Sequence, residues 1–263
     1  MSSFWSRILV GAAALPIVLG IVYLGGWWVF GLAVVAAAVA LHEFWLLTRP
    51  LRPLAPAGYV GGCLALLGAE LGGIDWMVGG AMTAIVLAFA FKAISEARQA
   101  ATASISATVT GAAWIGLGLG FLVLVRELPE HGRLAAFTVL LSVWAGDTFA
   151  YFGGRLLGRH TMAPRTSPGK TWEGFVFGTA ATLFVAFVAL YKQDFLTIGE
   201  SLVLGAVLAA AAPAGDLFES LLKRDMDVKD TGRLLGGHGG MLDRIDALLF
   251  AAPAAYFTIL AFT

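Results

Sequence analysis

The feature that most constrains this chain is a succession of long apolar segments. The hydrocarbon core of a bilayer requires about 20 apolar residues in a helix, and 263 residues leave room for about nine such helices. Outer-membrane strands are excluded, because the segments are too long and too uniformly apolar to alternate residue by residue. The predicted fold class is therefore all-α, a polytopic integral membrane protein with about nine transmembrane helices. We predict these helices at 8–24, 27–48, 58–74, 76–93, 108–126, 134–153, 174–192, 198–220 and 245–262.

The composition supports one membrane domain. Hydrophobic residues make up 59% of the chain and charged residues 13%, whereas soluble domains carry roughly 25% charged residues. We predict a single domain over 1–263, with N-terminal helices in 1–133 and the more highly charged helices and loops in 134–263. A formal net charge of zero argues against a nucleic-acid partner. Abundant Gly and Ala within the segments suit close helix packing in lipid and favour a homodimer.

The distribution of basic residues predicts the orientation. If the segments alternate in direction, fourteen of the seventeen Lys and Arg residues fall on the side of the N-terminus and three on the other side. The positive-inside rule then places the N-terminus in the cytoplasm and the C-terminus outside. Two polar loops supply nine of the fourteen, and the remaining count of five to three points the same way. We therefore expect a multi-pass protein of the cytoplasmic membrane.

Residues 216–246 form a dense polar island between two apolar segments. They contain seven carboxylates, five Lys or Arg residues and one His. Charge of this density opposes membrane insertion, so it indicates a function at the membrane surface. Helical spacing places four of its side chains on one face of the eighth predicted helix, and another two on one face of the ninth. The first set is Asp216, Glu219, Ser220 and Lys223, and the second is Asp243 and Asp246.

The residue types in the island predict phosphate chemistry. Carboxylates from two helix ends suit Mg²⁺, which prefers oxygen ligands, and the basic residues suit phosphate oxygens. Between them, the GlyGlyHisGlyGly segment at 236–240 lets the backbone approach a ligand closely. A metal and several basic groups beside a membrane indicate phosphoryl or nucleotidyl transfer to a lipid. The alternative is a charged loop that sets topology and attracts anionic lipid, but such a loop needs no carboxylates.

Two further regions carry candidate residues. SerProGlyLys at 167–170 is interpreted as a turn that presents Lys170 and Thr171 to phosphate, with a plain connector as the alternative. Asp147 lies within the sixth predicted helix, where an ionisable group is a functional hypothesis and a structural hydrogen bond is the alternative. His42 and Glu43, near the inner end of the second helix, either pair between helices or line the substrate cavity.

The segment SLLKRDMDVKDTGRLLGGHGGMLDRID, at 220–246, resembles the signature of the phosphatidate cytidylyltransferase (CDP-diacylglycerol synthase) family. SPGKTWEG and GDTFAYFGGRLLGRH resemble less formal blocks of the same family, so the likeness covers roughly 140–250. The family often has Lys where Gly169 stands and Pro where Gly236 stands. Neither position is expected to bind metal, so neither difference threatens the resemblance.

The resemblance implies that CTP and phosphatidate react to give CDP-diacylglycerol and pyrophosphate. Both substrates are anionic, so Mg²⁺ and basic residues must screen their repulsion. The implied metal ligands are Asp216, Asp243 and Asp246, and a second metal ion is allowed. The implied catalytic residues are these three carboxylates with Lys223, Lys229 and His238. The implied substrate-binding residues are Asp147, Lys170, Thr171, Ser220, Arg224, Asp230, Gly239, Gly240 and Arg244.

Three alternative functions remain open at this stage. A CTP-dependent lipid kinase would transfer the γ-phosphoryl group to an alcohol and release CDP. A related cytidylyltransferase would act on an ether-linked isoprenoid phosphate. A transporter would use Asp147, Glu43 and the polar loop as its pathway, although the charges cluster at one face and no repeated pair of broken helices is evident.

Overall fold

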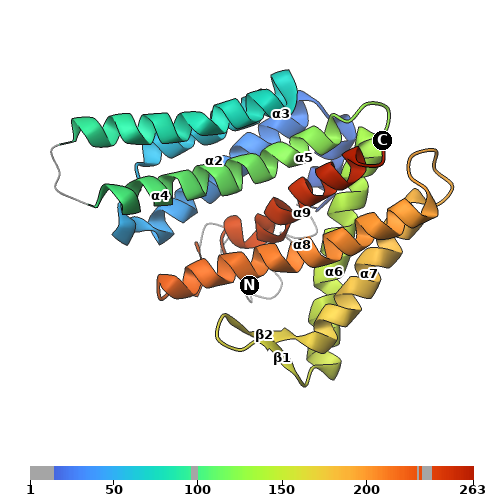
Figure 1. The fold of residues 1–263 in the computed structure, drawn as a ribbon. Coiled ribbons are helices and arrows are strands. Elements are labelled where there is room, and N and C mark those ends of the chain that lie inside the picture. Colours follow the sequence, from blue (N-terminus) through green and yellow to red (C-terminus); the bar gives the residue numbers. More distant parts are fainter. Residues whose placement is uncertain (1–14, 96–99, 230, 233–238) are drawn as a thin grey trace. The chain divides into compact units, whose positions relative to one another are not determined.

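The structure is a computed structural model that describes residues 15–95, 100–229, 231–232 and 239–263 (Figure 1). Helices dominate the described residues, which confirms the all-α fold class. The elements in chain order are a short helix Leu15–Leu24, α2 (Trp27–Leu47), a 3₁₀ turn η1 (Arg49–Leu51), α3 (Ala55–Ile94), α4 (Ala101–Gly111), a π-helical segment η2 (Ala112–Leu117), α5 (Gly118–Arg126), α6 (Gly132–Leu157), β1 (Thr161–Ala163), β2 (Ser167–Thr171), α7 (Trp172–Leu190), α8 (Ile198–Asp225) and α9 (Leu242–Leu260).

Six helices of the described ranges are long and apolar enough to span a membrane, so the chain is a multi-pass membrane protein. They are α2, α3, the continuous helix from Ala101 to Arg126, α6, α7 and α8. Helix α9 is as long as α7 but carries three charged residues near its start. The count of nine spans stays a prediction.

Helix α3 accounts for two of the predicted spans. It is 40 residues long, and Gly73 interrupts it with φ 71° and ψ −156°, a conformation open mainly to glycine. The two arms fold back on each other. Added Cβ atoms at Gly68 and Gly80 would collide with the backbone of Trp76 and Leu64 on the opposite arm. The arms correspond to the predicted helices 58–74 and 76–93.

The chain forms two compact units, which are described separately. The first unit holds the described residues up to Glu127 together with Val228–Ile245, and the second holds Leu128–Asp227 together with Asp246–Thr263. The prediction of one domain over the whole chain stays a prediction. The signature region therefore contributes to both units.

In the second unit, α6 and α7 run side by side, and the β1–β2 hairpin lies at one end of this pair (Figure 1). The strands are antiparallel, with Thr161 opposite Thr171 and Ala163 opposite Ser167. Sequence analysis anticipated a turn here but not the strands, because segments of three and five residues carry too little alternation to be recognised. The hairpin leads directly into α7, which begins at Trp172 as expected.

Side-chain caps fix the beginnings of α7 and α8. The Thr171 hydroxyl accepts a hydrogen bond from the Gly174 N–H at 3.1 Å, and Thr197 and Glu200 form a capping box. Helix α8 continues to Asp225, one turn beyond the predicted end at residue 220. Lys223 and Arg224 in its last turn favour this extension, because cations stabilise the negative end of a helix dipole.

Candidate active site

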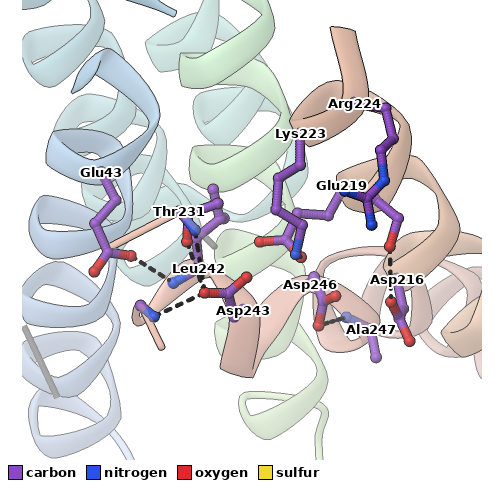
Figure 2. Close-up of polar contacts among 12 residues, drawn as sticks. Glu43, Asp216, Glu219, Lys223, Arg224, Thr231, Leu242, Asp243, Asp246 and Ala247 are labelled. Carbon is purple, nitrogen blue, oxygen red and sulfur yellow. Dashed lines mark hydrogen bonds and ion pairs between the residues drawn. The ribbon is translucent and has the colours of Figure 1, made fainter. Parts of the chain in front are cut away.

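The polar face of α8 exists as the spacing predicted. The Lys223 Nζ lies 2.6 Å from Glu219 Oε2, and the Ser220 hydroxyl donates to Asp216 Oδ1 at 3.4 Å (Figure 2). Glu219 is fully buried. A buried carboxylate requires a compensating charge or hydrogen bonds, and the Lys223 ammonium supplies such a charge.

The hairpin is joined to α8 at two points, both within the second unit. Lys170 Nζ lies 2.7 Å from Asp216 Oδ2 and 3.5 Å from the Pro213 carbonyl oxygen. Near the end of α8, Arg224 Nε donates to the Thr166 carbonyl at 3.1 Å. These contacts join residues of the hairpin to residues of α8 that lie 46 positions away for Lys170 and Asp216 and 58 positions away for Thr166 and Arg224. The predicted residues Lys170, Asp216 and Arg224 are thereby held between the hairpin and α8.

Asp246 joins the same cluster from α9. Its side chain is 6% exposed and faces the carboxyl groups of Glu219 and Asp216. One carboxylate oxygen of Asp246 also accepts the Ala247 N–H at 2.8 Å (Figure 2). Glu219 and Asp246 are buried, whereas the Asp216 side chain is 38% exposed and pairs with Lys170. A cation beside these carboxyl groups would offset their mutual repulsion, and carboxylate oxygens are ligands that a hard divalent cation prefers.

No group of three or more His, Cys, Asp or Glu side chains in the described ranges forms a metal-binding cluster. Mg²⁺ is commonly held by one or two carboxylates, with substrate phosphates and water completing its shell. The Asp216 and Asp246 pair fits such a site. Asp243 lies in the first unit, so the three-carboxylate metal set stays a prediction.

Asp147 lies at the wall of a small cavity between α6, α7 and α8. The cavity has a volume of about 30 Å³, and its lining includes Asp147, Thr179, Thr182 and Pro213. This volume suits one or two water molecules, whereas ligand pockets measure roughly 300 Å³ or more. The cavity is therefore too small for a nucleotide. Asp147 lies within electrostatic range of Asp216 and Lys170, so it adjoins the cluster, and its substrate-binding role stays a prediction.

The first unit contains a second polar cluster, centred on Asp243. Asp243 Oδ2 accepts hydrogen bonds from the Gly240 N–H at 2.7 Å, the Thr231 hydroxyl at 3.0 Å and the Thr231 N–H at 3.3 Å (Figure 2). Glu43 of α2 accepts the N–H groups of Met241 and Leu242. The described part of the signature is thus fixed by hydrogen bonds among its own residues and by hydrogen bonds to Glu43 of α2, a helix that is distant in sequence.

The remaining predicted residues have varied surroundings. Lys229 and Arg244 are exposed, and Gly239 adopts φ 78°, which favours glycine. Asp230 and His238 lie outside the described residues. The substrate-binding roles of all these residues stay predictions.

Three residues anchor the site in ways that the sequence does not predict. The sequence predicts an ion pair or a cavity lining for Glu43, but its carboxylate accepts backbone N–H groups. Thr231 carries no signal in the sequence that marks it as an anchor. Glu173, expected only to open α7, accepts the N–H groups of Arg159 and His160, and its other oxygen lies 2.6 Å from His160 Nδ1. The only sequence signal for Glu43 was an ionisable residue within an apolar helix.

Comparisons with known proteins point to one family of membrane enzymes. A sequence model of the cytidylyltransferase family matches residues 5–262. A phosphatidate cytidylyltransferase of Staphylococcus haemolyticus is 34% identical over 254 residues, covering 94% of this chain and 95% of that protein. Proteins of the same name from Haemophilus influenzae and Bacillus subtilis are 41% and 38% identical over 130 and 153 residues. These two matches cover 48% and 58% of this chain, and the chain spans about half the length of each relative, 45% and 57%. The chain belongs to the cytidylyltransferase family.

Proposed function

We propose that the chain transfers CMP from CTP to phosphatidate, giving CDP-diacylglycerol and pyrophosphate. The observation that carries this proposal is the cluster of the second unit. There Lys170 of the hairpin pairs with Asp216 of α8, and the charged side chains of Glu219, Lys223 and Asp246 lie beside them. Acidic and basic groups together suit a reaction between two phosphate esters that must be brought close. The names of the bacterial relatives support the same reaction.

The carboxylates of the cluster provide a place for Mg²⁺. We assign its binding to Asp216 and Asp246, with Glu219 beside them, and Asp243 remains a proposed further ligand for this or a second metal ion. When bound, Mg²⁺ would neutralise triphosphate charge and polarise the α-phosphorus. The ion would also supply positive charge beside Asp246, which is buried next to the carboxyl groups of Glu219 and Asp216.

The basic residues of the second unit hold the phosphates. Lys170 is paired with Asp216 in the structure, and its ammonium can exchange that carboxylate for a phosphate oxygen without leaving the site. Lys223 and Arg224 follow within the last turn of α8. An ionised phosphate oxygen of phosphatidate attacks the α-phosphorus of CTP. The new oxygen–phosphorus bond forms as the bond to the β-phosphate breaks and pyrophosphate leaves. Because the nucleophile is already ionised, no general base is required.

We place the enzyme in the cytoplasmic membrane, with its N-terminus and polar loops in the cytoplasm and its C-terminus outside. Contacts within the first unit support the alternation of the helices. Arg126 Nε donates to the Val22 carbonyl at 2.7 Å. This hydrogen bond joins two helix ends that are both predicted to lie at the outer side of the membrane. The Leu54 N–H donates to the Thr108 hydroxyl at 2.8 Å, which joins two segments predicted at the cytoplasmic side. A homodimer remains part of the proposal and is tested by mass measurement in detergent.

The proposed reaction is tested with purified protein in detergent, phosphatidate, and CTP labelled separately at the α and γ positions. Mg²⁺-dependent entry of the α label into lipid, with release of pyrophosphate, is the expected result. Entry of the γ label into an added polyprenol would identify a lipid kinase instead. Preference for an ether-linked isoprenoid phosphate over phosphatidate would identify the related cytidylyltransferase. Absence of transfer to any of these acceptors by folded protein would overturn all three enzyme assignments and favour the transporter.

A further inference from the structure

Glu43 is a buried acid in an unusual setting. It lies in α2, a helix with no other acidic residue, and its side chain is 0% exposed. A buried charge in an apolar helix is costly unless it is fully compensated. Glu43 receives two hydrogen bonds, from the Met241 N–H to Oε1 at 3.0 Å and from the Leu242 N–H to Oε2 at 2.8 Å (Figure 2).

The two donors mark the beginning of α9, whose first residue is Leu242. The first N–H groups of a helix have no partner within the helix, and a negative charge is stabilised there by the helix dipole. Capping usually comes from a residue next to the helix in sequence. Here the carboxylate comes from a residue 199 positions earlier. Glu43 therefore fixes the beginning of α9 against α2 within the first unit.

Two glycines of the signature lie so close to this carboxylate that a larger side chain would collide with it. An added Cβ at Gly232 would lie 2.5 Å from Glu43 Oε1, and one at Gly240 would lie 2.5 Å from Glu43 Oε2. Real Cβ atoms essentially never approach so closely. The two glycines thus leave the space that Glu43 occupies.

A second carboxylate, that of Asp243, binds residues near both ends of the segment 231–240. Asp243 binds Thr231 and the Gly240 N–H through one oxygen, so residues near both ends of the segment 231–240 meet at the first turn of α9. Glu43 holds that turn from outside the signature, and Asp243 holds it from within. Displacing Glu43 would release Met241 and Leu242 and shift Asp243 with them.

We propose that Glu43 is a positioning residue, which holds the first turn of α9 so that Asp243 and Arg244 have the orientation that nucleotidyl transfer requires. This inference rests on the proposed function. Both carboxylate oxygens are needed. Gln offers a single acceptor and turns an NH₂ group toward an N–H donor. Asp is one methylene shorter, so it reaches at most one of the two N–H groups without a shift of α2 or α9.

The test compares Glu43→Gln and Glu43→Asp with the wild type and with a control, Glu70→Gln, which removes an acid from α3 in the same unit. Turnover of labelled CTP and hydrogen–deuterium exchange of the peptide containing Met241 and Leu242 are measured on monodisperse protein in detergent. For Glu43→Gln we expect kcat to fall at least about tenfold with the KM for CTP within about twofold, since an interaction that acts on orientation lowers kcat. Exchange of the two N–H groups should accelerate at least about tenfold, because an opened hydrogen bond exposes them. For Glu43→Asp, kcat and the exchange rate should lie between those of Glu43→Gln and the wild type. For Glu70→Gln, both should equal the wild-type values.

Several results would overturn the inference. One is wild-type kcat in folded Glu43→Gln. A second is loss of kcat without faster exchange at Met241 and Leu242. A third is a lower yield of folded protein whose remaining molecules turn over normally, which would make the role structural only. If Glu43→Gln does not accumulate, Gly232→Ala displaces the same carboxylate and must reproduce the loss of kcat. Its control is Gly31→Ala in α2 of the same unit, whose Cβ would meet no atom within 4 Å. If the wild type transfers no CMP, the proposed function fails, whereas the exchange data still report on the Glu43 contact.

Discussion

Replacing Gly215 with Ala should damage catalysis while leaving the protein folded. Gly215 lies in α8 beside Asp216, at the point where α8 meets the Asp246 turn of α9 in the second unit. An added Cβ would lie 3.2 Å from both the Asp246 carbonyl carbon and the Ala247 Cα, and the Asp246 carbonyl oxygen would be closer still. These are backbone atoms, so no side chain can rotate away to make room.

The required displacement sets the magnitude. Non-bonded heavy atoms pack best at about 3.5–4.0 Å, so the backbone at Asp246 must retreat by about 1 Å. A misplacement of about 1 Å in a reacting geometry can lower the rate roughly 10²-fold. The intrinsic change from Gly to Ala favours a helix by about 1 kcal/mol, which offsets part of the packing strain. We therefore expect kcat to fall between about tenfold and 10²-fold while the protein still folds.

The assay measures initial rates of α-labelled CMP transfer to phosphatidate, with the thermal midpoint in detergent measured in parallel. Gly199→Ala is the matched control, because Gly199 is in the same helix and its Cβ would meet no atom within 4 Å. It should keep wild-type kcat. Wild-type kcat in Gly215→Ala would refute the reasoning, since it would mean that the separation of Asp216 and Asp246 does not limit the reaction. Equal losses in both variants would refute it as well.

Three further predictions concern single side chains of the second unit. Asp216→Asn should lower kcat by at least about 10³-fold while the protein remains folded, because it removes a proposed metal ligand; wild-type-like turnover would exclude Asp216 from the metal site. Thr171→Val should destabilise the protein by about 1 kcal/mol through loss of the α7 cap, measured as a lower thermal midpoint, and Thr171→Ser should restore it. Glu173→Ala removes the carboxylate that binds Arg159 and His160, so limited trypsin cleavage at Arg165 should become roughly fivefold faster; an unchanged cleavage rate would show that the hairpin does not depend on Glu173.

Hydropathy and spacing predicted most of the fold. The long apolar segments correspond to helices because a membrane requires every backbone group to be satisfied within the segment, and even Gly73 separates two predicted helices at the expected place. The polar face of α8 also followed from spacing, because residues three and four apart must be neighbours on a helix. These are local rules, and they need no knowledge of the tertiary structure.

The anchors of the site could not be predicted in the same way. No local rule connects Glu43 with Leu242 or Lys170 with Asp216, since each pair is distant in sequence and depends on how helices pack. The hairpin was missed for a related reason, because its strands are shorter than any reliable periodic signal. The sequence therefore predicts candidate groups for the chemistry, but it does not predict the groups that hold them in place.

The positions of these anchors have a consequence for the signature itself. In the first unit its glycines make room for Glu43 of α2, and in the second unit Asp216, which precedes the signature, is paired with Lys170 of the hairpin. Neither partner belongs to the signature. A peptide of the polar island 216–246 alone would lack both the acceptor for the first N–H groups of α9 and the cation beside Asp216, so its carboxylates would repel one another with no fixed geometry. The chemistry that we propose for this chain therefore depends on segments outside the signature, and we expect a substitution of the one acidic residue of α2 to matter as much as one within the signature.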